Sequence, residues 1–280
     1  MHRSLAMIRF LPPLLVTLAI FAFAPAMGPL APWLRAKLGE GFAPLVTWSL
    51  AAAGAAGVVF VLRLLHTGSH LPRPTRYALV LAGPALAILQ QLASTRGTPA
   101  EAAVERAHLL FYGALMILLH RAFFLGRVRA GRVPGPEVPL AALAITTLVA
   151  FADEGLQWAL VLRVGELYDV AFDVFAAGCA LLTACGLYPP RWTVPLEPRP
   201  RRLLASLCAA VALCAAAFID LAHLGYLIRD PELGSFRSYF SASELARRDL
   251  ERRERWASTP PRRPFGALEI EDYYQTEAGW

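Results

Sequence analysis

Residues 139–160 read PLAALAITTLVAFADEGLQWAL, and this stretch indicates the fold of the whole chain. A transmembrane helix needs roughly 20 mainly apolar residues to cross about 30 Å of hydrocarbon, and this stretch has that length. Its charges come only near the end, where Asp153 and Glu154 are followed by Gln157. We therefore predict a membrane-spanning helix that finishes in a polar group.

The rest of the chain has a similar composition. Of its 280 residues, 56% are hydrophobic and 17% are charged, and the mean hydropathy is +0.47. Because soluble domains carry about 25% charged residues, this composition favours a membrane protein. We predict an all-α, polytopic transmembrane helix bundle of about seven helices with a short C-terminal extramembrane tail. The predicted spans cover residues 6–25, 42–65, 77–93, 105–124, 139–160, 167–188 and 204–228.

The spans divide the chain into four regions. These are N-terminal transmembrane helices at 1–76, a transmembrane core at 77–188, the last transmembrane helix at 189–228 and a polar tail at 229–280. In the tail, Ser241 and Glu244 form a capping box, which predicts a short helix over about 242–257. The charged tail is a candidate docking element for a partner in a membrane complex. Residues 1–26 resemble a signal peptide, but their apolar run is long for one, so we favour an uncleaved helix.

Basic residues gather in alternate connections between the spans. One set of connections holds thirteen of them and the other set holds five. Because positively charged loops stay in the cytoplasm, this asymmetry predicts a cytoplasmic N-terminus and an extracytoplasmic tail. The thirteen are Arg3, Arg9, Arg63, Arg73, Arg76, Arg121, Arg127, Arg129, Arg132, Arg191, Arg199, Arg201 and Arg202, and the five are Arg35, Lys37, Arg96, Arg106 and Arg163.

Charge and cysteine content disfavour two classes of function. The formal net charge of +6 comes from arginines that punctuate the spans, which is typical of membrane orientation and not of phosphate binding. The cysteines have no metal-binding spacing and stand in apolar stretches, so we expect buried thiols. We therefore expect no nucleic-acid partner, no cofactor and no metal, with membrane lipid as the general partner. The cysteines are Cys179, Cys185, Cys208 and Cys214.

Polar residues gather toward one side of the predicted bundle. Counted at 1.5 Å per residue, Glu154, Asp173 and His223 lie about 8–10 Å beneath the outer membrane boundary. Ionisable residues at such depth mark function by default, so we predict a polar pocket that faces outward. Its candidate ligand-binding residues are Arg106, His108, Tyr112, Asp153, Glu154, Gln157, Arg163, Asp169, Asp173, Asp220 and His223.

Structural explanations compete with this interpretation. His108 and Tyr112, taken alone, would more often be an interfacial packing pair than a catalytic one. Asp220 and His223 are three residues apart and can satisfy each other. Glu154 and Asp173 are harder to explain structurally, because an unpaired carboxylate at that depth is costly or protonated.

Three short motifs occur in order within residues 77–188. They are ERAHLLFYG at 105–113, DEGLQW at 153–158, and the set Arg163, Gly165 and Asp169-Val170. Together they resemble the signature of the VanZ-like family of bacterial integral membrane proteins. In that family a basic residue, a His and Tyr-Gly open one helix, and DE-x-x-Q ends another.

The chain also departs from the family pattern. Asp173 stands where the family usually has Asn, and Ala176 where it commonly has Gly. Val161-Leu162 replaces the usual Pro-Gly before the loop arginine. The resemblance implies a cell-envelope protein of the bacterial cytoplasmic (inner) membrane, connected with resistance to the glycopeptide antibiotic teicoplanin. The extra carboxylate of Asp173 would change the charge of its pocket.

Several hypotheses follow for the pocket. The leading one is the binding of an anionic, lipid-linked or glycopeptide-type envelope ligand, with Arg163 engaging the anionic group. An alternative is a membrane-embedded enzyme with His108 and Glu154 as acid and base and Asp173 as a third catalytic candidate. A metal-assisted form of that enzyme is conceivable, since an imidazole and several carboxylates can hold a divalent ion. A structural subunit that docks through residues 229–280 is a further alternative, whereas a transporter is disfavoured by the lack of an internal repeat.

Overall fold

The structure is a computed structural model, and it describes most of the chain between Ile8 and Ser238. The described residues are 8–41, 44–45, 48–49, 52, 57, 59, 61, 69–93, 99–159, 167–218, 226–230, 234–238, 247 and 250. They contain six α-helices with defined ends, a short 3-10 turn and one β-hairpin. The elements are α2 (Leu11–Leu38), η1 (Gly39–Gly41), α4 (Arg73–Ala93), α5 (Pro99–Arg129), α6 (Glu137–Ala159), α7 (Leu167–Leu187), α8 (Pro198–Ala217), β1 (Tyr226–Asp230) and β2 (Gly234–Ser238).

The helices confirm the predicted all-α transmembrane bundle. Within the described residues, four helical segments are long and apolar enough to cross a membrane. These segments are Ala107–Arg129, Glu137–Gln157, Leu167–Leu187 and Pro198–Ala217. Every described residue between 44 and 61 is also helical, as the prediction of a span at 42–65 requires.

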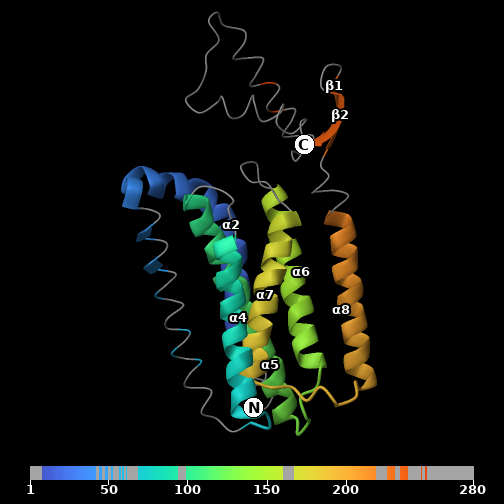
Figure 1. Cartoon of the computed structure of the whole chain (residues 1–280). Helices are drawn as coiled ribbons and strands as arrows, with labels where there is room; N and C mark the ends of the chain where they lie inside the picture. The colour runs from blue at the N-terminus through green and yellow to red at the C-terminus, as the bar shows by residue number, and fades with distance from the viewer. Residues whose placement is uncertain are drawn as a thin grey trace, which may run out of the picture.

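Helix α7 lies at the centre of the bundle. It packs against α4, α5 and α6, while α8 packs on α6 and α2 packs on α5 and α6. Figure 1 shows α4, α5, α6, α7 and α8 running side by side along one direction, while the lighter-blue part of α2 turns across one end of the bundle. Helix α8 is peripheral, and Leu204 is its one buried side chain among the described residues. A peripheral apolar helix of this kind presents its side chains to lipid.

Two glycines allow α4 and α7 to approach closely. A Cβ atom added at Gly83 would collide with the backbone oxygen of Cys179 and lie 2.6 Å from Oγ1 of Thr183. The Thr183 hydroxyl donates a 3.3 Å hydrogen bond to the backbone oxygen of Val80. At the other end of the contact, a Cβ at Gly186 would lie 2.9 Å from the backbone oxygen of Arg76. Small residues serve this role in membrane helices because lipid provides no hydrophobic drive for helix association.

A Schellman motif ends α5. The N–H of Gly131 bonds to the oxygen of Val128 at 3.0 Å, and the N–H of Arg132 bonds to the oxygen of Arg127 at 2.9 Å. Gly131 has φ +68°, a left-handed conformation that glycine adopts without penalty. The motif turns the chain into the short connection to α6.

An ion-pair network, here called the arginine clamp, joins α5, α6 and α8 at this end of the bundle. Arg127 Nε lies 2.9 Å from Glu137 Oε1, in the geometry of an ion pair without an aligned hydrogen bond. Arg127 also contacts Glu197 at 3.4 Å, and Arg132 contacts Glu197 at 2.8 Å. The clamp thus fixes the starts of α6 and α8 to the end of α5.

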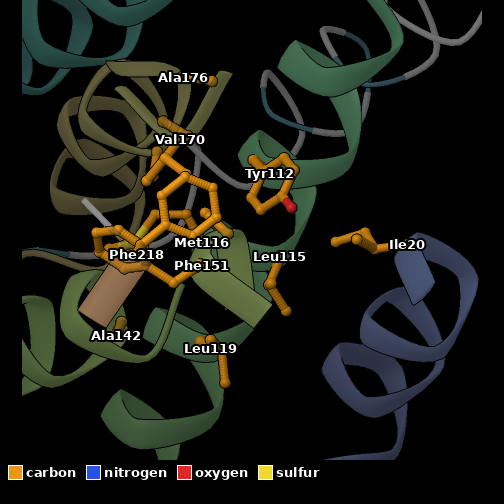
Figure 2. Packing of buried hydrophobic residues seen from close by; sticks show 13 residues of the cluster. Ile20, Tyr112, Leu115, Met116, Leu119, Ala142, Phe151, Val170, Ala176 and Phe218 are labelled. Carbon is orange, nitrogen blue, oxygen red and sulfur yellow. The ribbon is translucent and has the colours of Figure 1, made fainter. Parts of the chain in front are cut away.

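The apolar core lies among α5, α6 and α7, with contributions from α2 and α8. Figure 2 shows Met116 beside Phe151, with Tyr112 and Leu115 on the same helix as Met116 and Ile20 approaching from α2. Each of these residues is buried. Phe218 follows the end of α8 and packs its ring on Phe151, with ring centroids 5.9 Å apart. This contact carries the core toward the end of the bundle where α6 ends.

The structure corrects several predicted boundaries. Helix α2 runs to Leu38 and not to about residue 25, because its prolines do not end it. Helix α5 extends over Pro99–Arg129, which is longer than the predicted 105–124.

The C-terminal part differs more strongly from the prediction. Helix α8 spans Pro198–Ala217, whereas a helix over 204–228 was predicted. Tyr226–Asp230 is instead the first strand of an antiparallel hairpin, with Tyr226 paired to Ser238 and Asp230 to Gly234. The predicted boundary between residues 228 and 229 therefore falls inside β1. Of the predicted tail helix at 242–257, the described residues Arg247 and Leu250 are helical, and the rest lies outside the described residues.

Candidate functional site

The directions of α5, α6 and α7 bring three polar helix ends together. Helix α5 starts, α6 ends and α7 starts at the same end of the bundle, here called the α6–α7 end. Six side chains converge there, and we call them the polar cluster: His108, Tyr112, Asp153, Glu154, Gln157 and Asp173. All six are among the predicted site residues.

One branch of the polar cluster joins α5 to α7. The Nδ1–H of His108 donates to Oδ1 of Asp173 at 3.0 Å when the carboxyl group is ionised. The imidazole stacks near the ring of Tyr112, with centroids 6.1 Å apart and planes 19° apart. This spacing follows from the helix, where residues four apart share a face. The contacts fix the orientation of the imidazole, whose side chain is 13% exposed.

The second branch joins α5 to α6. The Tyr112 hydroxyl donates to Oδ2 of Asp153 at 3.1 Å. The side-chain amide of Gln157 donates to Oε1 of Glu154 at 2.7 Å, and reaches Oδ2 of Asp153 at 3.4 Å. Asp153, Glu154 and Gln157 thus face the bundle interior together, as their spacing over one helical turn predicts.

The three carboxyl groups of the polar cluster lie close together and are buried. One oxygen from each of Asp153, Glu154 and Asp173 lies within 4.8 Å of the other two. The exposed fractions of these residues are 3%, 0% and 0%. Oδ2 of Asp173 is buried and has no hydrogen-bond partner in the described part of the chain. The cluster therefore contains three carboxyl groups, two from α6 and one from α7.

The other predicted site residues stand less clearly at this site. Asp169 lies on α7 one turn before Asp173 and is half-buried. Arg106 lies within α5, but the position of its side chain is outside the described residues. Arg163, Asp220 and His223 lie outside the described residues altogether. Asp220 and His223 come after the end of α8 at Ala217, so their predicted pairing is not tested.

The opposite half of the bundle holds more buried polar groups than the sequence indicates. His120 is fully buried, and its Nε2 lies 2.8 Å from the backbone oxygen of Tyr188. Arg76 is buried and donates from Nε to the backbone oxygen of Gly186 at 3.0 Å. His120 stands four residues after Met116, on the same buried face of α5, and this periodicity is the signal that would have placed it inside.

The polar cluster supports two kinds of chemistry. Its carboxylates can accept hydrogen bonds from hydroxyl or amine groups or bind a cation, and its oriented imidazole can exchange a proton at Nε2. Proteins of known family or structure add no further constraint to this geometry. No family model, no curated protein and no solved structure matches the chain.

Proposed function

We propose that this chain is a VanZ-like protein of the bacterial cell envelope that binds an amphiphilic, lipid-linked ligand at the polar cluster. The single observation behind this proposal is the convergence of six polar side chains, from three helices, at one end of a membrane-spanning bundle. Ionisable groups inside membrane helices are rare, and they usually face a site and not lipid. The motif resemblance of residues 77–188 adds support from the sequence.

The chemistry of the polar cluster narrows the ligand class. Asp153, Glu154 and Asp173 would repel a bare anion but accept hydrogen bonds from hydroxyl and amine groups, which sugar and peptide headgroups carry. An anionic linkage in the same ligand requires a cation, and Arg106 and Arg163 are the basic residues closest in sequence to the cluster. The ligand we propose is therefore a lipid-linked sugar or peptide with an anionic group between its two parts.

The membrane side follows from the distribution of basic residues. The connections at 130–136 and 188–197 lie at the end of the bundle opposite the polar cluster, and they belong to the arginine-rich set. The positive-inside rule assigns that end to the cytoplasm, so the polar cluster faces the extracytoplasmic leaflet. Lipid-linked envelope precursors and glycopeptides are encountered on that side.

The proposal is tested with teicoplanin as a phenotypic probe and an envelope lipid extract as a binding probe. A strain that expresses the wild-type chain should tolerate more teicoplanin than a strain with an empty vector. Native mass spectrometry of the purified protein should show a retained lipid-linked species. Glu154→Gln and Arg163→Ala should lose both effects, whereas Glu197→Gln, at the opposite end of the bundle, should keep them. If Glu154→Gln and Arg163→Ala both behave like the wild type, the binding role is excluded.

Acid–base catalysis at His108 is a second candidate, favoured by its 3.0 Å contact with Asp173. A carboxylate on Nδ1 orients an imidazole and leaves Nε2 to exchange protons with a substrate. The partner of His108 in the structure is Asp173, while Glu154 bonds to Gln157, so this pair differs from the acid and base combination inferred from sequence. Incubating wild type and His108→Gln with the same lipid extract tests it, because only an enzyme yields a product that the variant fails to form.

A further inference from the structure

The three carboxylates of the polar cluster form a compact set of oxygen atoms. Asp153 and Glu154 are neighbours on α6, and Asp173 reaches them from α7. One oxygen of each lies within 4.8 Å of the others, and all three residues are buried. Ionised carboxylates that lie this close together in a buried site repel one another strongly unless protons or positive charges offset them. A divalent cation between the three carboxylates would offset this repulsion.

Asp173 supplies an independent observation that points to a ligand. Its Oδ1 accepts the hydrogen bond from His108, but its Oδ2 is buried and accepts none among the described residues. A buried carboxylate oxygen without a partner is costly, and such groups are rare in folded proteins. A bond to a metal ion satisfies this oxygen without another protein donor.

The chemistry of the ligand atoms narrows the class of metal ion, and their spacing allows one ion to reach all three. Three atoms that are no more than 4.8 Å apart share a point within about 2.8 Å of each, which is 4.8 Å divided by √3. Calcium binds oxygen at about 2.3–2.6 Å, whereas magnesium requires about 2.0–2.1 Å. Zinc also binds at about 2.0–2.2 Å and prefers nitrogen or sulfur ligands. An all-oxygen set of buried carboxylates suits calcium, which accepts flexible coordination, better than magnesium, which requires near-ideal octahedral geometry and usually keeps several waters.

Each of the three carboxylates accepts a hydrogen bond from another side chain of the polar cluster. His108 donates to Asp173, Tyr112 donates to Asp153, and the Gln157 amide donates to Glu154. Donors of this kind orient metal-ligating side chains, and their loss typically weakens metal binding about 10- to 100-fold. The polar cluster thus contains both a ligand set and the groups that would position it.

From these observations we infer that Asp153, Glu154 and Asp173 form a binding site for a divalent cation, with calcium as the preferred ion. The site joins α6 to α7 within the membrane-spanning bundle. It goes beyond the proposed function, since cation binding needs neither the lipid-linked ligand nor teicoplanin.

Calcium binding is tested on the purified full-length chain in detergent micelles after treatment with a chelator. Equilibrium dialysis against calcium should show saturable binding of one ion, and the melting temperature should rise with calcium concentration. Magnesium and zinc, tested in the same way, should bind more weakly. These measurements contain no lipid-linked ligand, so their failure is distinct from a failure of the proposed function.

Matched variants locate the ion. Asp173→Asn and Glu154→Gln each remove one charge with little change in shape, and each should weaken calcium binding more than tenfold. His108→Gln should weaken it about 10- to 100-fold through the lost hydrogen bond. Glu197→Gln, which removes a carboxylate at the opposite end of the bundle, should bind calcium like the wild type. Monodisperse elution on size exclusion identifies the folded variants, and having two carboxylate variants keeps the test decisive if one misfolds.

Two results would overturn the site. One is a folded wild-type protein that shows no saturable binding at calcium up to about 10 mM, tenfold above the weakest range of extracellular calcium sites. The other is calcium binding that persists unchanged in every folded carboxylate variant.

Discussion

At the scale of single residues, removing the Tyr112 hydroxyl is the most direct test of the hydrogen bonds in the polar cluster. It is buried and donates to Asp153 at 3.1 Å, so Tyr112→Phe leaves a buried carboxylate with one donor fewer. We expect a loss of about 1 kcal/mol in the free energy of unfolding, since hydrogen bonds between membrane helices are worth about that much. Denaturation in mixed micelles measures this change in the free energy of unfolding. Tyr77→Phe is the control, because Tyr77 is exposed and should tolerate the change. Equal losses in both variants would contradict the assigned bond.

The polar cluster could be predicted residue by residue only in part. Asp153, Glu154 and Gln157 share a helical face by spacing alone, and the same rule places His108 over Tyr112. Which carboxylate meets which donor depends on the rotation of α5 and α7 about their axes, and spacing within one helix carries no information about that. The pairing of His108 with Asp173 was therefore visible only in the fold.

At the scale of helices, the contact between α4 and α7 depends on Gly83. Gly83→Ala places a methyl group against the Cys179 backbone oxygen and the Thr183 hydroxyl, neither of which is a flexible chain end. Overpacking of this kind should cost about 1–3 kcal/mol in the free energy of unfolding. Gly178→Ala on α7 is the matched control, since a Cβ there meets nothing within 4 Å, and it should be neutral or slightly stabilising. If the two variants unfold alike, the close approach of the helices is not what holds this contact.

The existence of the helices was easier to predict than their ends. Apolar runs longer than about 18 residues leave few alternatives to a membrane helix, so the all-α bundle followed from hydropathy. The hairpin of β1 and β2 was missed because Tyr226-Leu227-Ile228 continues an apolar run. Arg229 and Asp230, next in the chain, were the available signal that the run had left the membrane.

At the scale of the whole molecule, the arginine clamp links three helices into one unit. The Arg127 side chain is 16% exposed and that of Glu137 is 9% exposed, so Arg127→Gln leaves a largely buried carboxylate without its ion-pair partner. Breaking a buried pair in this way costs about 3–5 kcal/mol. Arg132→Gln removes an exposed contact with Glu197 and should cost less than about 1 kcal/mol. Mixed-micelle denaturation of both variants compares these losses, and a similar cost for each would show that burial does not strengthen the clamp.

The orientation of the whole bundle is the last prediction, and it determines which compartment the polar cluster faces. The arginine-rich connections lie opposite the cluster, and the positive-inside rule keeps the side with more basic residues in the cytoplasm. The C-terminal tail should therefore lie outside the cytoplasm. A fluorescent protein fused after Trp280 should then not fluoresce, while alkaline phosphatase fused there should be active. Arg132→Cys, at an exposed position between α5 and α6, should react with an impermeant maleimide in inverted vesicles but not in intact cells. A fluorescent C-terminal fusion with labelling of intact cells would reverse the orientation, and the polar cluster would then face cytoplasmic ligands.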